Sequence, residues 1–297
     1  MRAMAARKRF GRSTRRDAGS TANATGPLLL GLLLLQSGSI RAADGGQPAA
    51  PAAEGTHPEN TAPEAASRAK RGRDLYTRRF SGRWAMLQVI VTESDLPVVG
   101  KLYATTRVVT LFDLEYERQR LRGKGSLCRM EIDSGTSMVE TLLPAAFVRS
   151  LPPPLLDASL RQQGDRWLLE QKRQTILVGA RLDDPLHDPL PSQAGDARVF
   201  DQDRDGKPGV TIHLDGIVEG EIYVAQRNWT ALSGQLEAPG RFKGRIAFGN
   251  EQHILDATSW FLKHSPGVKP TSGRSLFYLV RMGSKAGCPE ALGLFNL

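Results

Sequence analysis

The chain has 297 residues, which is enough for one large domain or two small ones. Its formal net charge is +9, but the first 42 residues hold eight basic residues and one acidic residue, which leaves 32 basic and 30 acidic residues in the remainder. Because the excess charge belongs to the N-terminal segment and no basic stripe interleaved with aromatic residues follows it, we expect no nucleic-acid partner.

Residues 1–42 have the pattern of a cleavable signal peptide. A basic segment precedes the apolar run at 27–35, which is too short to span a bilayer, and small residues follow up to Ala42 and Ala43. The pair Arg15 and Arg16 leaves the general and the twin-arginine export routes both open. No later run reaches the roughly 18 apolar residues of a membrane helix. We therefore expect an exported protein, periplasmic or extracellular, with no transmembrane segment in the mature chain.

Residues 43–72 are dominated by alanine, proline, glycine and glutamate, without apolar periodicity. Such a segment buries too little apolar surface to offset the entropy cost of ordering it. We expect a disordered Ala/Pro-rich linker at 43–72, followed by a single β-rich domain at 73–297.

Runs rich in β-branched and aromatic residues recur through the domain, separated by turn residues. They lie at 84–91, 99–117, 124–133, 137–142, 166–179, 209–215, 220–233, 240–249 and 275–283. Helical patterns are sparse: one begins at Pro144 and ends before the prolines at 152–154, and another lies near 252–263. The pattern predicts an all-β fold, an antiparallel β-barrel or sandwich of eight to ten strands with one or two short helices.

Two faces are visible in the run at 221–229, which predicts a barrel wall or a two-layer sheet. Ile222 and Val224 would face one side, and Tyr223 and Ala225 would face the other.

The chain contains two cysteines, Cys128 and Cys288. In an oxidising compartment an even count predicts a disulfide, and buried free thiols are the alternative. Because the two cysteines are about 160 residues apart, the chain-entropy model predicts that a bond between them stabilises the fold by about 4–5 kcal/mol. The bond would connect the last strand to the first third of the domain.

The acidic segment at 201–209 reads DQDRDGKPG. Three carboxylates at alternate positions, Asp201, Asp203 and Asp205, converge when the backbone turns around a hard cation, and Gly206 permits that turn. The segment resembles the D-x-D-x-D-G calcium loops of EF-hands and dockerins. The resemblance implies calcium as the cofactor, with the carbonyl of Lys207 as a further ligand. A solvated acidic turn is the alternative.

The acidic segment departs from an EF-hand at its twelfth position, where Ile212 replaces the bidentate glutamate. The missing carboxylate would come from Asp196, Asp215 or Glu219, with calcium affinity in the range of about 10⁻⁴–10⁻³ M found in extracellular modules. We expect the site to stabilise the loop that leads into the strand at 209–215.

Two further segments, KPGVTI at 207–212 and YVAQR at 223–227, resemble uncharacterised exported proteins of Gram-negative bacteria. The resemblance implies export and a β-domain, and it implies no chemistry.

The segment IDSGTS at 132–137 resembles the D-[ST]-G-[ST] turn of pepsin-like and retropepsin-like aspartic proteases. The resemblance implies that Asp133 is a catalytic carboxylate supported by Thr136 or Ser137, with the apolar segment at 176–179 packed behind. The chain holds one such motif, so a symmetric dimer would be needed to bring two carboxylates together. A Ser/Gly hairpin turn is the alternative.

The sequence is compatible with three functions. The first is an exported, non-enzymatic β-domain, braced by calcium, that binds an unknown ligand or envelope partner. The second is a dimeric aspartic protease that uses Asp133. The third is a structural protein of the envelope.

Overall fold

The computed structural model describes residues 74–96, 100–137, 139–216, 219–263, 269–271 and 273–297. Residues 74–80 are helical. The elements that follow are β1 (Gly82–Leu96), β2 (Gly100–Glu117), β3 (Arg120–Asp133), β4 (Val139–Leu142), α2 (Ala145–Ser150), β5 (Leu155–Gln163), β6 (Arg166–Val178), β7 (Val210–Gly216), β8 (Gly220–Ala238), β9 (Arg241–Ala257), α3 (Trp260–Lys263), β10 (Lys269–Pro270), β11 (Leu276–Arg281) and α4 (Cys288–Phe295). The predicted antiparallel all-β fold is confirmed.

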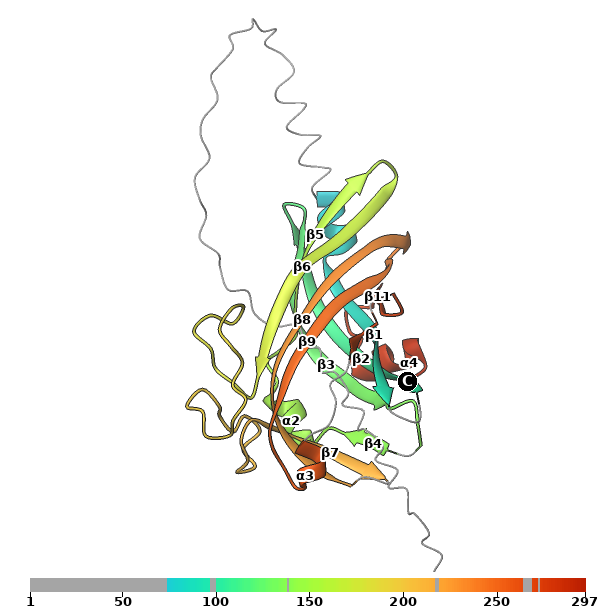
Figure 1. The fold of residues 1–297 in the computed structure, drawn as a ribbon. Helices are drawn as coiled ribbons and strands as arrows, with labels where there is room; N and C mark the ends of the chain where they lie inside the picture. The colour runs from blue at the N-terminus through green and yellow to red at the C-terminus, as the bar shows by residue number, and fades with distance from the viewer. Residues whose placement is uncertain (1–73, 97–99, 138, 217–218, 264–268, 272) are drawn as a thin grey trace, which may run out of the picture.

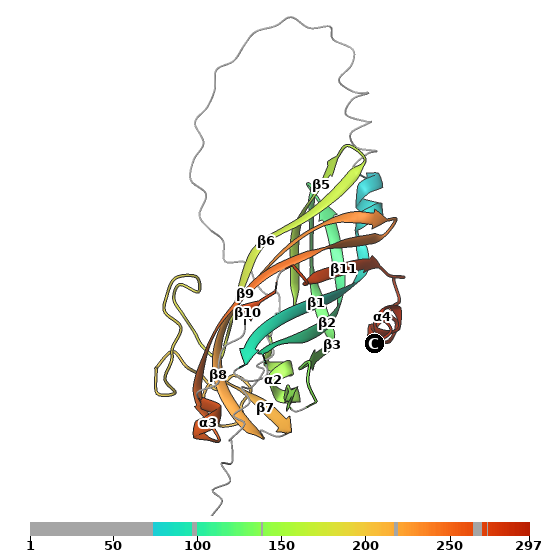
Figure 2. The same cartoon turned by 45° about the vertical axis from the view of Figure 1, so that its right-hand side comes forward.

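Eight strands close into a ring in which every neighbouring pair is antiparallel. The order is β8, β6, β5, β3, β2, β1, β11 and β9, and the pairing of β9 with β8 closes the ring. The resulting barrel is seen from two sides in Figures 1 and 2. β6 and β7 pair one after the other with β8. The pairing with β6 ends where Val178 meets Gln226, and the pairing with β7 begins where Val210 meets Val224. β4 pairs with β7 outside the ring.

The inside of the barrel is filled by side chains at alternate positions of its strands, as the two-residue period of a β-strand requires. Trp84 and Phe112 face each other across the β1–β2 pair and belong to a large aromatic and aliphatic cluster. Ile222 and Val224 also face inward, in a second apolar cluster, whereas Ala225 packs on the outside. The predicted two-faced character of this segment is therefore confirmed.

Short helices cover the two ends of the barrel (Figures 1 and 2). Phe80, at the end of the helix at 74–80, is 1% exposed and joins the cluster around Trp84. Phe147 of α2 is fully buried in the cluster that contains the inward-facing residues Ile222 and Val224. The barrel is thus a packed core at both ends.

Two facing glycines make room for one aromatic ring inside the barrel. Gly234 of β8 pairs with Gly244 of β9, and a Cβ at Gly244 would lie 2.5 Å from the ring of Phe277 and 2.3 Å from the carbonyl oxygen of Ser233. Any larger residue at 244 would have to displace the ring or the strand.

The segment 179–209 leaves the barrel between β6 and β7 and packs on the outer face of β8 and β9. Leu190 and Ala180 contact Ala225 and Leu255 in a separate apolar cluster. Arg227 of β8 lies beneath this segment, 9% exposed, and donates hydrogen bonds to the carbonyl oxygens of Leu186 and Asp188.

Among the features that differ from the sequence-based expectation are three that concern β5, α3 and α4. β5 was not predicted, because its alternating residues directly follow the prolines at 152–154. The segment predicted as a helix near 252–263 is the end of β9 and then a helix of four residues, α3. Cys288 opens α4 and does not lie in the last strand.

The predicted signal peptide at 1–42 and linker at 43–72 lie outside the described residues. In the part of the chain that the structure describes, no helix has the length and apolar character needed to cross a membrane.

Candidate metal site

The acidic loop at 201–209 is shaped by hydrogen bonds from backbone amides to its own carboxylates. Asp201 accepts from the amides of Asp205, at 3.1 Å, and Gly206, at 2.9 Å. Asp205 accepts from the amide of Lys207 at 2.8 Å. Gly206 has a φ of 85°, which a glycine adopts without steric cost. The loop is therefore a tight turn whose carboxylates point inward.

Three carboxylates meet in this turn. Asp201, Asp203 and Asp205 each offer an oxygen within 4.8 Å of the other two. Asp203 is 7% exposed, and its Oδ2 accepts a hydrogen bond of 2.9 Å from the amide of Thr211. Its Oδ1 is buried and has no hydrogen-bond partner among the described residues. Burial, followed by the charges of Asp205 and Asp201, raises the pKa of Asp203.

The positively charged side chains of the loop do not neutralise this cluster. The ammonium group of Lys207 lies over the ring of Tyr223, 5.4 Å from its centroid. No ion pair in the described part of the chain joins a lysine or arginine to the three carboxylates. A buried carboxylate oxygen without a donor is costly, and a hard cation with oxygen ligands such as Ca²⁺ would satisfy it. The residues present therefore fit a metal ion.

The hydroxyl of Tyr223, whose ring lies beside Lys207 of the loop, donates to Glu221 at 2.8 Å. Burial and the neighbouring Glu221 raise the pKa of Tyr223 to about 12. The phenol is therefore neutral at physiological pH and supplies no charge to the site.

The expected fourth carboxylate does not join the cluster in the described residues. Ile212, at the twelfth position, is fully buried in the core. Asp196 is paired with Arg198 at 2.6 Å, and Asp215 lies on β7 opposite Glu140. A bound cation would complete its shell with backbone carbonyls, for which Lys207 remains the predicted donor, and with water.

The loop is connected to three neighbouring elements. Gln202 accepts from the amide of Gly179, directly after β6, and donates to the carbonyl and hydroxyl oxygens of Ser150, at the end of α2. Thr211 of β7 donates its amide to Asp203 and its hydroxyl to Asp205. Gln202 and Thr211 were missed by sequence reasoning, because their partners lie in other elements. An ion in this loop would hold the end of β6, the start of β7 and α2 in one arrangement.

Asp196 and Arg198 form an ion pair that also holds the outer segment. Arg198 donates from Nε, Nη2 and its amide to Asp196 and from Nη1 to the carbonyl oxygen of Pro189. Hydrogen bonds from Arg198 lower the pKa of Asp196 to about 2.

The lowered pKa of Asp196 predicts a specific pH dependence. The carboxylate stabilises the fold above its unfolded pKa, and this contribution is lost as the pH falls from about 4 to about 2. We expect Asp196→Asn to show a smaller loss of urea midpoint than the parent protein between pH 5 and pH 2.5. An identical loss in both proteins would show that the pair does not contribute.

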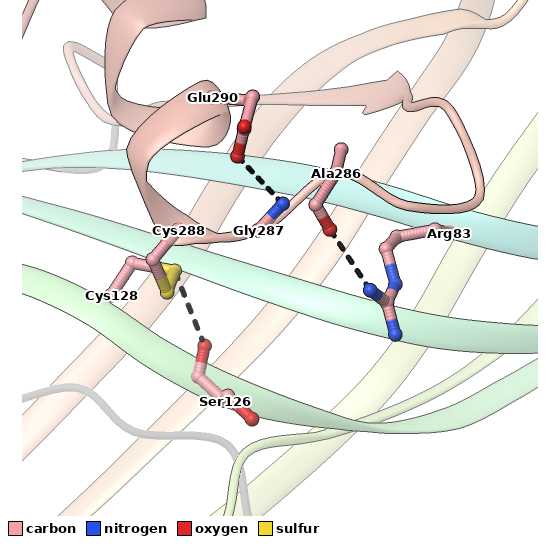
Figure 3. Close-up of a disulfide and its surroundings, with 7 residues drawn as sticks. All are labelled: Arg83, Ser126, Cys128, Ala286, Gly287, Cys288 and Glu290. Atoms are coloured by element: carbon pink, nitrogen blue, oxygen red, sulfur yellow. Dashed lines mark hydrogen bonds between the residues drawn. A yellow bond between two sulfur atoms is a disulfide. The ribbon is translucent and has the colours of Figure 1, made fainter.

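Cys128 and Cys288 form a disulfide, as predicted, with their Cα atoms 5.2 Å apart. Cys128 is the extra residue of a β-bulge, since Val109 pairs with Arg129 and the next residue of β2 pairs with Leu127. The bond holds the first turn of α4 against the outer wall (Figure 3). On this face of the wall, Ala291 packs on Ala85 and Val109. Arg83 donates to the carbonyl oxygen of Ala286, just before the helix.

The protease-like motif forms the turn after β3. Asp133 is exposed, and its Oδ1 accepts a hydrogen bond of 3.0 Å from the amide of Gly135. The segment at 176–179 lies at the end of β6 and pairs with β8, whereas β3 pairs with β2 and β5. The dimeric protease remains a prediction to which this geometry adds no support.

No protein-family model, no curated protein and no solved structure matches the chain.

Proposed function

We propose that the chain is an exported, non-enzymatic β-barrel domain that binds a ligand or partner in the cell envelope or outside the cell and is stabilised by calcium at its acidic loop. The calcium site is supported above all by the Asp203 carboxylate. It is 7% exposed, its Oδ1 lacks a hydrogen-bond partner among the described residues, and it lies close to the carboxylates of Asp201 and Asp205. Three oxygen ligands of this charge suit Ca²⁺ better than softer metals.

The disulfide supports the exported location. Such bonds persist in oxidising compartments and are rare in the cytosol of most organisms. Because the bond joins residues 160 positions apart, its stabilisation of the fold is large, and it is present only where the bond stays oxidised. The signal-peptide pattern at 1–42 and the disulfide are independent features that point to the same compartment.

A binding role is supported by the architecture. Both ends of the barrel are filled by apolar clusters and covered by short helices. The outer surface and the long segment at 179–209 are then the places where a ligand or partner would be contacted. We do not propose a structural role in the envelope, because no feature of the described residues favours it.

Calcium is expected to raise the thermal midpoint of the purified protein. At 10 mM calcium a site with Kd of about 10⁻⁴–10⁻³ M adds about 1.4–2.7 kcal/mol. This corresponds to a rise of about 3–10 °C for a domain of this size. The double substitution Asp203→Asn, Asp205→Asn should abolish the rise. Without calcium the double variant should be at least as stable as the parent, because two repelling charges are removed.

Asp165→Asn serves as the matched control. Asp165 lies in the exposed turn between β5 and β6, outside the acidic cluster, so this variant should keep the full calcium effect. Differential scanning calorimetry with calcium and with chelator measures all three proteins. Equal midpoints in calcium and in chelator for the parent protein would refute the calcium site.

A further inference from the structure

A shallow hollow of about 370 Å³ lies on the outer face of the barrel, between β9 and the segment that precedes β11. It is lined by Lys243, Gly244, Arg245, Gly273, Arg274, Ser275 and Leu276. Three of these residues are cationic and none is acidic. Lys243 and Arg245 reach the outer face together because they alternate with Phe242 and Ile246, which are buried inside.

The two arginines of the hollow have no carboxylate partner among the side chains that the structure describes. Arg245 donates to the carbonyl oxygen of Gly273 at 2.8 Å, and the guanidinium of Arg274 lies 4.2 Å from the ring centroid of Tyr103. Among the described residues, neither arginine forms an ion pair. Lys243 shares Glu237, at 3.8 Å, with Arg241.

A second basic hollow on the same molecule provides the contrast. It measures about 360 Å³ and includes Arg118, Arg120, Arg161 and Lys172. Here two of the cations pair with carboxylates of the hollow itself, since Asp157 lies 2.6 Å from Arg120 and Glu170 lies 3.0 Å from Arg161. The two hollows are of nearly equal size, but two carboxylates line the second and none lines the first.

We propose that the hollow of Lys243, Arg245 and Arg274 binds a phosphate group carried by a small soluble ligand or by a lipid head group. A guanidinium donates to phosphate oxygens in a planar, bidentate fashion, and three cations suit a dianion. Gly273 leaves the backbone of the hollow open to close approach, since nothing lies within 4 Å of the position that a Cβ would take there. This inference rests on the proposed ligand-binding function and names the class of ligand.

The test is isothermal titration of the purified full-length chain with inorganic pyrophosphate, in calcium-free buffer. We expect saturable binding that weakens with added salt. The double substitution Arg245→Gln, Arg274→Gln should weaken it at least tenfold. The control Arg161→Gln, in the neutralised hollow, should change it less than twofold. Thermal midpoints of all variants verify that each one folds.

A second arm distinguishes the two sources of the phosphate. Co-sedimentation is measured with vesicles of phosphatidylcholine that contain 20% phosphatidic acid, and with phosphatidylcholine alone. Pyrophosphate binding that the double variant loses supports a soluble ligand. Retention on the acidic vesicles only, lost in the double variant, supports a lipid head group.

Two results would overturn the inference: no binding of either probe, or equal loss in the double variant and in Arg161→Gln. Because the titration uses no calcium, its failure is distinct from a failure of the calcium site, which the thermal shift measures separately.

Discussion

Replacing Cys128 and Cys288 together by serine is expected to lower the free energy of unfolding by about 4–5 kcal/mol, because the disulfide closes a loop of 160 residues in the unfolded chain. The bond also holds α4, a helix of eight residues, on the barrel wall. A helix this short is marginal by itself, so it depends on that contact. Urea unfolding of the oxidised parent and the double variant measures the difference.

Leu292→Ala is the control for the packing of α4, because it removes a contact of the helix and leaves the disulfide intact. Its loss of stability should be smaller than that of the cysteine double variant. A reductant should lower the urea midpoint of the parent to that of the cysteine double variant and leave the double variant unchanged. A parent midpoint that does not respond to reductant would contradict the assigned role of the bond.

Trp84→Ala is expected to cost about 3–5 kcal/mol of stability, since it opens a large cavity at one end of the barrel. Trp84 is fully buried, lies 5.9 Å from the ring of Phe242, and donates from Nε1 to the carbonyl oxygen of Phe80 at 2.9 Å. The substitution therefore also removes a hydrogen bond to the end of the helix at 74–80. Urea unfolding followed by circular dichroism gives the change in free energy.

Trp260→Ala is the matched control, because Trp260 on α3 is 76% exposed. A substitution at an exposed position is expected to change stability by no more than about 0.5 kcal/mol. Comparable losses in the two tryptophan variants would mean that the barrel interior near Trp84 is not the packed core described above.

The strand period explains why the fold class was predictable from the sequence. Alternation at 221–229 placed Ile222 and Val224 on one face and Ala225 on the other, and the barrel wall has this arrangement. β5 escaped prediction although its buried residues alternate too, because three prolines precede it and obscured its start. Local patterns identify a strand only where turn residues mark both of its ends.

The acidic loop, like the strands, was predictable from the sequence only in part. The spacing of Asp201, Asp203 and Asp205 was sufficient to predict that they converge, since a single turn brings them together. Among the described residues no fourth carboxylate joins the three, because Asp196 is engaged by Arg198 and Ile212 is buried in the core. The link from Gln202 to α2 crosses 52 positions of sequence and has no local signal.

The sequence by itself determined the β-class, the disulfide pair and the acidic triad, because each depends on residue type and on periodicity over a few positions. Only the tertiary structure decided that β1 pairs with β11 to close the ring, that Cys288 begins a helix on the outer wall, and that Arg274 lies beside Lys243 and Arg245. These arrangements join segments tens to hundreds of residues apart. They are selected by the burial and hydrogen bonding of the whole barrel, which no local pattern encodes.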